Sequence, residues 1–411
     1  MKIFFFYISA FLFTTQTFAA VWHVNPLPGK KAISIAIGSA RPYDTVIIGK
    51  GLYKEGNIVI DKPLYILGEK GTIIDGEEKY EVISVKSDDV TIDGLQVQRA
   101  GYSSTNDFAG IKIYDAKHVS IINNIILETH FGIYGQFINH CIISNNIIRS
   151  NTADEIIAGN GIHCWKSDSV SIMHNRISGH RDGIYFEFVT NSIIVSNFSN
   201  KNLRYGLHFM FSGSNTYVNN IFSNNGSGVA VMYSKQVKMY GNTFSKSEGS
   251  AAYGILLKDI SDSDIDKNVF LKNTTGVYME GTSRIRINQN RFDHNGWAFK
   301  ISANCMDIDV TQNNFTGNTF DVGTNGSLNL NRFKNNYWDK YEGYDLNRDG
   351  LGDVPYRPVS MYSMIIEKNP SSAILLRSLM VDLLDKIEKI IPSLTPIDLI
   401  DNAPLMKLFK K

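Results

Sequence analysis

Short runs of alternating apolar and polar residues recur along most of the chain, and turns rich in Asn and Gly separate them. An alternation with a period of two predicts β-strands, because successive side chains of a strand point to opposite faces of its sheet. One pattern marks the repeat, an Asn followed two residues later by Ile, Phe or Tyr. It occurs at Asn124, Asn146, Asn175, Asn220, Asn242, Asn268, Asn290, Asn313 and Asn335, and Asn197 holds the same place although Ser199 follows it.

Most of these Asn residues are 22 or 23 positions apart, and a Gly followed by an apolar residue comes later in most repeats, as in Gly183-Ile184 and Gly206-Leu207. A unit of this length predicts an all-β fold, a right-handed parallel β-helix (β-solenoid) with about 22 residues per coil. A propeller or another all-β repeat is the alternative, but a propeller blade needs about 40 residues. In a solenoid the recurrent Asn would lie at a turn and bond the Asn of the next coil.

Two repeats are longer than the others, with 29 residues from Asn146 to Asn175 and 26 from Asn242 to Asn268. The insertions lie around 151–160 and 245–253, and insertions in solenoids form loops on one face, often the binding face. The apolar segment 33–40 predicts a short helix that caps the N-terminal end, where an open solenoid would otherwise expose a sheet edge. We therefore expect a capped solenoid at 20–336 and a C-terminal appendage at 337–411.

The N-terminus has the pattern of an export signal. Met1-Lys2 precedes the apolar run 3–13, and Thr17-Phe18-Ala19-Ala20 has the small residues of a cleavage site. We expect cleavage after Ala19, so that 1–19 is a signal peptide and the mature protein is extracytoplasmic. An uncleaved membrane anchor is the alternative, although the apolar run is short for a bilayer.

Composition excludes some classes of function but gives no further information about the fold. The chain has 411 residues, with 41 Lys and Arg against 40 Asp and Glu, a net charge of +1. This balance argues against a sequence-independent nucleic-acid binder, which needs a basic excess or stripe. Three scattered cysteines, Cys141, Cys164 and Cys305, do not form a disulfide framework. We expect buried free thiols, with a disulfide or metal role as the alternative.

The strand after each repeat Gly has apolar first and third residues, so its second and fourth residues point outward. These outward pairs are Lys112/Tyr114, Tyr134/Gln136, His163/Trp165, Tyr185/Glu187, His208/Met210, Ala230/Met232, Leu256/Lys258 and Tyr278/Glu280. Glycoside hydrolysis needs two carboxylates within about 5–9.5 Å. Glu187 and Glu280 are four coils apart, about 19 Å at the spacing of β-strands. This strip therefore predicts no catalytic acid pair.

Two other polar groups have simple interpretations. Asp259, Asp262, Asp264 and Asp266 alternate along a turn and strand, which is typical of a solvated face. The segment from Gly179 to Gly183 contains His180, Arg181 and Asp182 and favours an ordinary polar turn, with a catalytic cluster as the alternative.

The outward strip also carries ligands for a soft metal. His208, Met210 and Met232 lie in adjacent coils, and His163 lies two coils from His208. Imidazole with thioether suits Cu(I), so we consider transient copper binding here. The other interpretation is a contact strip for a protein partner that uses Met as an adaptable filler and includes Tyr185, Glu187 and Tyr278. The two interpretations are compatible.

The repeat ends near residue 336, and two features follow. Asp345, Asn347, Asp349 and Asp353 have the spacing of a calcium loop, but Tyr356 stands where the bidentate Glu belongs, so a self-bonded turn is the alternative. The segment 371–391, between Pro370 and Pro392, has the apolar spacing of an amphipathic helix.

The run Asn336-Tyr337-Trp338-Asp339, the segment from Asp349 to Pro358 and the tail with Asn402-Ala403-Pro404-Leu405-Met406 closely resemble the NosD family. The resemblance covers almost the whole mature chain, and its C-terminal part is the specific one. It implies a non-catalytic periplasmic protein, attached peripherally to the inner membrane through an ABC transporter permease and its ATPase. It further implies a role in assembling the copper–sulfide cluster of nitrous oxide reductase, with copper from a copper-carrying lipoprotein. Leu405 and Met406 would contact the permease.

Two other functions fit a secreted β-helix. One is a carbohydrate-active protein such as a polyuronate lyase or epimerase, against which the missing acid pair argues. The other is a structural protein of the cell envelope, which has no reason to associate with a transporter.

Overall fold

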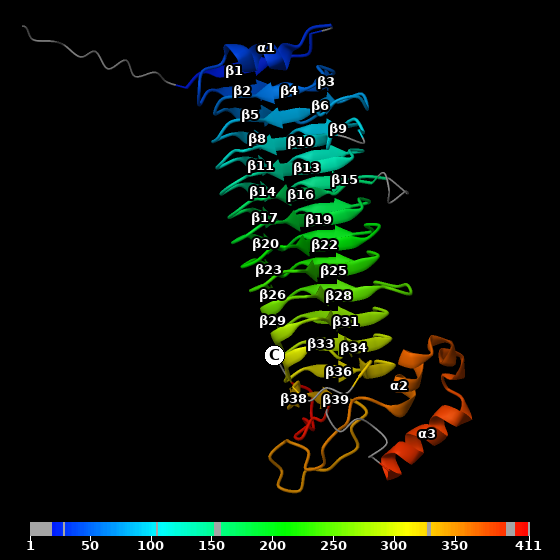
Figure 1. Cartoon of the computed structure of the whole chain (residues 1–411). Helices are drawn as coiled ribbons and strands as arrows, with labels where there is room; N and C mark the ends of the chain where they lie inside the picture. Colours follow the sequence, from blue (N-terminus) through cyan, green and yellow to red (C-terminus); the bar gives the residue numbers. More distant parts are fainter. Residues whose placement is uncertain are drawn as a thin grey trace, which may run out of the picture.

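The computed structural model describes residues 19–27, 29–103, 106–151, 158–326, 330–391 and 399–409. In this part, the chain winds into one elongated solenoid with three parallel sheets, A, B and C, along its sides (Figure 1). Each coil passes through sheet C, then A, then B. The predicted right-handed parallel β-helix is confirmed.

Sheet A contains β1 (Val21–Val24), β2 (Thr45–Ile48), β5 (Tyr65–Gly68), β8 (Thr91–Asp93), β11 (Ser120–Ile122), β14 (Ile142–Ser144), β17 (Ser171–Met173), β20 (Ile193–Val195), β23 (Thr216–Val218), β26 (Lys238–Tyr240), β29 (Ser261–Asp266), β32 (Ser283–Asn288), β35 (Met306–Thr311) and β38 (Arg332–Lys334). Sheet B contains β3 (Gly51–Tyr53), β6 (Thr72–Asp75), β9 (Gln96–Gln98), β12 (Ile125–Leu127), β15 (Ile147–Arg149), β18 (Arg176–Ser178), β21 (Phe198–Asn200), β24 (Ile221–Ser223), β27 (Thr243–Ser245), β30 (Val269–Leu271), β33 (Arg291–Asp293), β36 (Asn314–Thr316) and β39 (Tyr337–Trp338). Sheet C contains β4 (Ile58–Ile60), β7 (Ile83–Val85), β10 (Ala109–Tyr114), β13 (Phe131–Gln136), β16 (Ile162–Trp165), β19 (Asp182–Glu187), β22 (Tyr205–Met210), β25 (Ser227–Met232), β28 (Tyr253–Lys258), β31 (Thr275–Glu280), β34 (Trp297–Ile301) and β37 (Phe320–Thr324).

Equivalent apolar residues of successive coils stack to form the core. In the C-terminal half the inward residue of each sheet B strand is aromatic, and the stacked rings are those of Phe222, Phe244, Phe270, Phe292, Phe315 and Trp338. All six side chains are buried, and adjacent ring centroids lie 4.0–5.5 Å apart. The same position holds Ile126, Ile148 and Ile177 in earlier coils. Cys141, Cys164 and Cys305 are also buried in this core, and no two of them are bonded, as expected.

The recurrent Asn side chains form a buried ladder along the turn between sheets A and B. The Nδ2 group of Asn146, for example, donates to Asn175 Oδ1 and to the carbonyl of Ile121, while its Oδ1 accepts from the backbone N–H of Asn124. The last Asn of the ladder is Asn336, so the assignment of the repeat to Asn335 was wrong. Asn335 fits the pattern because Tyr337 follows it by two residues, whereas Asn336 is followed at that distance by Trp338. Asn335 instead takes the left-handed backbone conformation of the turn, with φ of 56°.

Helix α1 (Ala32–Ser39) covers the N-terminal end of the core, as the segment 33–40 predicts (Figure 1). Its N-terminal N–H groups, at Ile33 and Ser34, donate to the carboxylate of the buried Glu55. The predicted signal peptide 1–19 lies outside the described residues except for Ala19.

The C-terminal segment contains α2 (Met361–Lys368), the 3-10 helix η1 (Pro370–Leu375) and α3 (Leu379–Ile390). The single helix predicted over 371–391 is therefore wrong, although the segment is helical in parts. Arg377 has a φ of 65°, and the hydroxyl of Ser378 caps α3 by accepting from Val381 N. In the described part of the chain, no helix is long and apolar enough to cross a membrane.

Asp401 ends the Asn ladder. This fully buried carboxylate accepts hydrogen bonds from Asn336 N, Asn336 Nδ2 and Trp338 Nε1 through one oxygen, and from Asn335 N through the other. Every earlier member of the ladder must both accept and donate, whereas the last member only needs to accept, which suits a carboxylate. The tail also pairs with sheet B through Leu405 and Tyr337, so it closes the C-terminal end of the solenoid.

We predict that Asp401→Ala lowers the free energy of unfolding by about 2–4 kcal/mol, because it leaves several buried donors without an acceptor. Denaturant unfolding at neutral pH measures the change. Asn402→Ala, at the exposed neighbouring position, is the matched control and should change stability by less than about 0.5 kcal/mol. Equal stability of the two variants would contradict the capping role.

Candidate functional site

The outward strip of sheet C has the arrangement that the sequence predicts. Strand register places Tyr134, His163, Tyr185 and His208 next to one another in successive coils. The second column runs from Trp165 through Glu187 and Met210 to Met232. Both columns lie on the outer face of the sheet, in the middle of the solenoid.

The first column is a stack of rings rather than a set of separate exposed side chains. His163 stacks on Tyr134 at 4.4 Å between centroids and lies 4.8 Å from Tyr185, which lies 4.8 Å from His208. The ammonium group of Lys112 lies 4.8 Å from the centre of the Tyr134 ring and continues the column. Tyr134 and Tyr185 cover the ring of His163, and Tyr185, Tyr205 and Asp182 pack around that of His208. The two imidazoles are therefore only 8% and 4% exposed although they point outward.

No residue in the described part of the chain bonds to either ring nitrogen of His163. Burial, assisted by the nearby positive charge of Arg181, lowers its pKa to about 3. His180, at the turn before β19, is also fully buried, and burial lowers its pKa to about 3. Both imidazoles are therefore neutral in the folded protein at neutral pH.

His208 differs because a carboxylate fixes its orientation. Its Nδ1 lies 3.3 Å from Asp182 Oδ2, and Asp182 also accepts from Arg204 at 2.6 Å. Burial opposes ionisation of Asp182, but the hydrogen bonds from His208 and Arg204 hold its pKa at about 2. The anion favours the tautomer with the proton on Nδ1, since Arg204 Nη2 is farther away, at 3.5 Å from that nitrogen. The Nε2 lone pair then has no partner in the structure.

This geometry suits a metal ligand. A metal-binding imidazole usually donates its other N–H to a carboxylate or carbonyl, which fixes its tautomer. Met210 and Met232 are register partners, and Met210 follows His208 by two residues on the same face. Strand register thus places three of the four predicted copper ligands on one face of two adjacent coils, and copper binding there stays a prediction. His163 is separated from His208 by Tyr185, so it does not belong to the same cluster.

The residues predicted to bind a partner lie in different places. Tyr185 is part of the ring stack, and Glu187 follows Trp165 in the second column. Tyr278 lies farther along the strip, with its ring 5.1 Å from that of Tyr253. Leu405 and Met406 pair by their backbones with Asn336 and Gly350, and their side chains are half-buried at the C-terminal end.

The carboxylates of the predicted calcium loop turn toward the loop's own backbone. Asp345 accepts from the N–H groups of Asp349 and Gly350, and Asp353 accepts from Leu346 N. Asn347 Oδ1 likewise accepts from Asp349 N. Among the described residues, no three His, Cys, Asp or Glu side chains gather as a metal site. Calcium binding at this loop stays a prediction.

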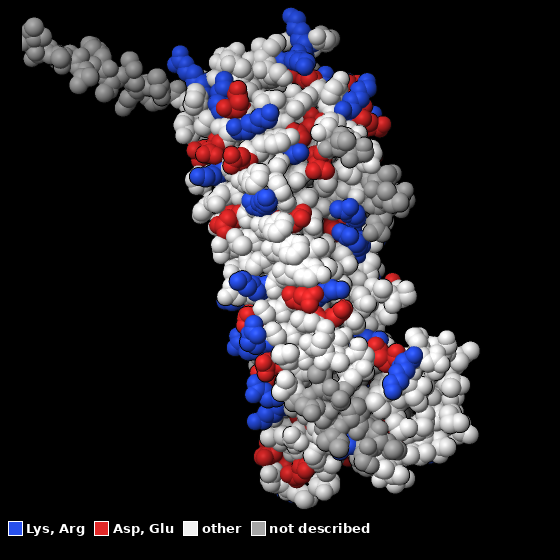
Figure 2. Space-filling model, in the orientation of Figure 1, with Lys and Arg blue, Asp and Glu red and all other residues white. Residues whose placement is uncertain are grey.

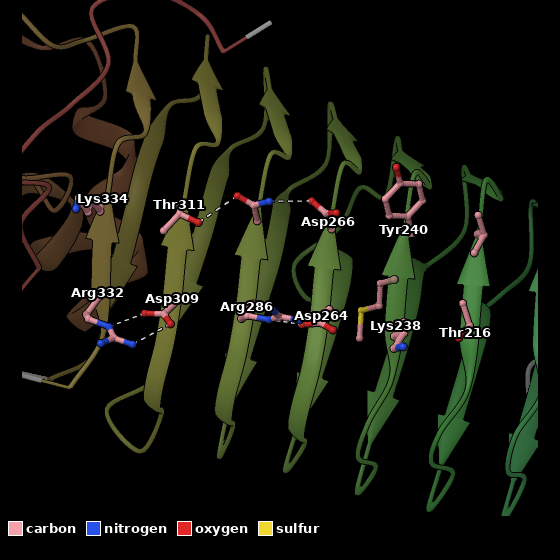
Figure 3. Close-up of a pocket in the computed structure, with 13 residues that line it drawn as sticks. Thr216, Lys238, Tyr240, Asp264, Asp266, Arg286, Asp309, Thr311, Arg332 and Lys334 are labelled. Atoms are coloured by element: carbon pink, nitrogen blue, oxygen red, sulfur yellow. Dashed lines mark hydrogen bonds and ion pairs between the residues drawn. The ribbon is translucent and has the colours of Figure 1, made fainter. Parts of the chain in front are cut away.

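A second candidate surface lies on the outer face of sheet A, where a groove of about 920 Å³ crosses β23 to β38 (Figure 3). Charges alternate along it in register, in the order Lys238, Asp264, Arg286, Asp309, Arg332. Arg286 and Arg332 pair with Asp264 and Asp309 at 2.6 Å. Two of the four carboxylates predicted as a solvated face, Asp262 and Asp264, are thus paired with arginines, Arg284 and Arg286.

Sequence reasoning missed Asp182 and Arg204 as parts of the site. The signal was present in the polar segment from Gly179 to Gly183, which was assigned to an ordinary turn. Only the stacking of coils shows that Asp182 lies beside His208, because the two residues are 26 positions apart.

We predict that folding becomes less favourable as the pH falls from about 6.5 toward 3. In this range an unfolded histidine takes up a proton, whereas buried His163 and His180 do not, so each lowers the free energy of unfolding by up to about 1.4 kcal/mol per pH unit. His163→Phe keeps the ring stack and removes one group that binds a proton only in the unfolded state. The slope of the free energy of unfolding against pH should therefore become less steep. Denaturation at several pH values measures it, with Tyr185→Phe, from the same stack, as the control. An unchanged slope in His163→Phe would contradict the assignment.

Known proteins resemble the chain in sequence. The family described as periplasmic copper-binding protein (NosD) matches residues 138–345. A probable ABC transporter binding protein NosD of Pseudomonas aeruginosa is 28% identical over 93% of this chain and 95% of its own length. The protein of the same description from Stutzerimonas stutzeri is 26% identical, over 86% of this chain and 85% of its own length.

Solved structures share the fold. A family 28 exopolygalacturonase of Yersinia enterocolitica has a TM-score of 0.59 at 13% identity, over 78% of this chain and 79% of its own. A GH87 α-1,3-glucanase of Streptomyces thermodiastaticus has a TM-score of 0.58 at 13% identity, over 74% of this chain and 62% of its own. At this identity the likeness concerns the β-helix alone. The sequence matches, with the solenoid and its C-terminal segment, place the chain in the NosD family of periplasmic copper-binding proteins.

Proposed function

We propose that this protein is a periplasmic, non-catalytic maturation factor. Exported by its signal peptide, it works with a membrane ABC transporter, a permease and its ATPase, to assemble the copper–sulfide cluster of nitrous oxide reductase. The observation that carries the proposal is the outward cluster of His208, Met210 and Met232, in which a buried carboxylate orients the imidazole. A copper-carrying lipoprotein supplies the copper, and the relatives' description as ABC transporter binding proteins supports the transporter.

The cluster suits copper in transit. One neutral imidazole and two thioethers are soft, uncharged ligands that prefer Cu(I) to harder ions. Met210 and Met232 are half-buried and so reach the surface, where an ion can be exchanged with a second protein.

The described surfaces also support a non-catalytic role. A general acid must hold a proton at working pH. Asp264 and Asp309 of the sheet A groove are instead paired with Arg286 and Arg332. The hydrogen bonds from Arg284 hold the pKa of the neighbouring Asp262 at about 2. Glu280 of sheet C is paired with Lys258. Asp262 therefore stays ionised at neutral pH, which does not suit the general acid of a glycosidase.

The C-terminal helices offer a docking surface for the permease. Tyr362, Ile366 and Val381 pack on Trp297 of the solenoid. The other apolar residues of η1 and α3 face outward, with Ile374, Leu379 and Ile390 exposed by 88%, 84% and 78%. Such an apolar patch is typical of an interaction site. The protein would thereby attach to the inner membrane through its partner, with Leu405 and Met406 on the same end.

We predict that a strain lacking this protein exports nitrous oxide reductase without its copper–sulfide cluster. Metal analysis and the absorption spectrum of the purified reductase measure the outcome. The wild-type gene should restore the cluster, whereas the Leu379→Ser/Leu383→Ser/Ile390→Ser variant should fail because it cannot dock on the permease. Circular dichroism and detergent co-purification separate lost docking from lost folding. A fully metallated reductase in the deletion strain would refute the proposal.

For the copper cluster, we predict that His208→Ala/Met210→Ala/Met232→Ala weakens Cu(I) binding by at least about tenfold, because it removes all three soft ligands. Competition with a chromophoric Cu(I) chelator measures the affinity. Met306→Ala, at an exposed methionine of β35 outside the cluster, is the control and should bind as wild type. Equal Cu(I) affinity of the triple variant and wild type would show that these three residues do not bind copper.

A further inference from the structure

A contact between a carboxylate and an arginine on sheet C recurs one coil earlier without its carboxylate. Asp182 directly precedes the repeat Gly of its coil, and Arg204 lies two residues before the repeat Gly of the next coil. Their side chains pair at 2.6 Å, and Asp182 is fully buried. One coil earlier the same two places hold Asn160 and Arg181. A neutral amide therefore stands where the other pair has its acid.

The backbone places Asn160 beside Arg181. Arg181 N donates to the carbonyl of Gly159, and Gly161 N donates to that of Asp182. Asn160 is fully buried, yet no described residue bonds to its Nδ2 or its Oδ1 atom. The buried Nε of Arg181 likewise has no acceptor in the described part of the chain. Buried polar atoms in native proteins are almost always hydrogen-bonded, so this group of atoms points to a ligand.

His163 adds a third group to this place. It follows Asn160 by three residues, and both of its ring nitrogens are buried without a partner among the described residues. Burial and then the charge of Arg181 are the main causes that lower the pKa of His163, so the guanidinium lies near the imidazole. Arg181 is half-buried and thus connects the two buried groups with solvent. We call Asn160, His163 and Arg181 the Arg181 site.

The Arg181 site has one positive charge that no described acid pairs with. Arg204 has its own carboxylate, and Lys112 lies 3.9 Å from Glu81. Glu187 lies at the far end of β19 from the turn that carries Arg181. Few acidic side chains lie across the middle of the face that sheets A and C share, so the described surface there has no acidic patch (Figure 2). A partly buried charge is costly unless a negative group neutralises it.

We propose that the Arg181 site binds a small, singly charged oxyanion of the kind of bicarbonate, formate or nitrate. A guanidinium presents parallel N–H groups that match two oxygens of a planar anion. The amide of Asn160 and the one N–H of neutral His163 donate to the same oxygens. A carboxylate on the surface of another protein does not reach the fully buried amide, which selects a free ion. The inference is independent of the proposed copper function.

Titration calorimetry tests the proposal with sodium bicarbonate, formate and nitrate in turn, at an ionic strength held constant with sodium chloride. At least one of the three should bind to the wild-type protein. Sulfate, whose second charge has no partner in the site, should bind at least about tenfold more weakly. Arg181→Gln removes the positive charge and should lower the affinity for the bound anion by at least about tenfold. No binding by wild type, or equal binding by Arg181→Gln, would overturn the inference.

Asn160→Asp is an independent test, because it reproduces the carboxylate–arginine contact of the next coil. The new carboxylate should displace the anion, and without added oxyanion the variant should melt at or above the wild-type temperature. Asn202→Asp is the matched control, since Asn202 is also buried but donates both N–H bonds of its amide, to Ser199 and Asn225. It should bind the anion as wild type and melt at a lower temperature. An equal fall in melting temperature for the two variants would contradict the missing acid.

A last variant separates the free anion from a carboxylate of the chain itself. Asp154 and Glu155 belong to the insertion before Asn160 and lie outside the described residues. Asp154→Asn/Glu155→Gln should bind the anion with wild-type affinity. If the anion bound only to this variant and not to wild type, an acid of the insertion would be the partner of Arg181, and the inference would be overturned.

Discussion

The amide ladder from Asn124 to Asn336 holds the coils that it joins in register, and the outward columns of those coils depend on that register. Each ladder Asn donates to the Asn of the next coil and to a core carbonyl, and it accepts from the coil before. A slip of one residue in any coil would break both contacts and turn the apolar residues outward. The ladder therefore holds successive coils in register, even where insertions around 151–160 and 245–253 lengthen them. It also explains the carboxylate at its end, since Asp401 needs only to accept.

A fixed register turns the surface into columns in which one residue per coil can vary without a change in the backbone. Three columns have different chemistry on the same scaffold: the ring stack of sheet C, the ion-pair ladder of sheet A, and the stacked rings of Phe188, Phe211 and Tyr233 at the turn between them. Because neighbours in a column lie one strand apart, about 4.8 Å, each residue is covered by the next. This is why His163 and His208 are buried on an outer face.

The sequence predicts the features that repeat and misses those that arise once. The solenoid, the helix at 33–40 and the outward columns follow from period and alternation, and the structure confirms them. The repeat alone does not show whether Asn335 or Asn336 belongs to the ladder, because an aromatic residue follows each of them by two positions. Only the backbone conformation of the turn distinguishes the two. Apolar spacing likewise cannot show that Arg377 interrupts the helix of 371–391. The contact between Asp182 and His208 depends on the stacking of two coils, which no local pattern encodes.

A protein that passes copper onward must bind it without trapping it, and the placement of sulfur in this chain fits that need. A thiolate binds Cu(I) strongly, and the chain has three cysteines, but all are buried in the core. Burial raises the pKa of Cys141 to about 11 and that of Cys164 further still, so both remain thiols. Cys164 lies on the same strand as His163 and faces inward while His163 faces outward. On the outer face, the sulfur ligands that copper would meet are the thioethers of Met210 and Met232. A thioether carries no negative charge to offset that of the ion, so release of copper from it costs less than release from a thiolate.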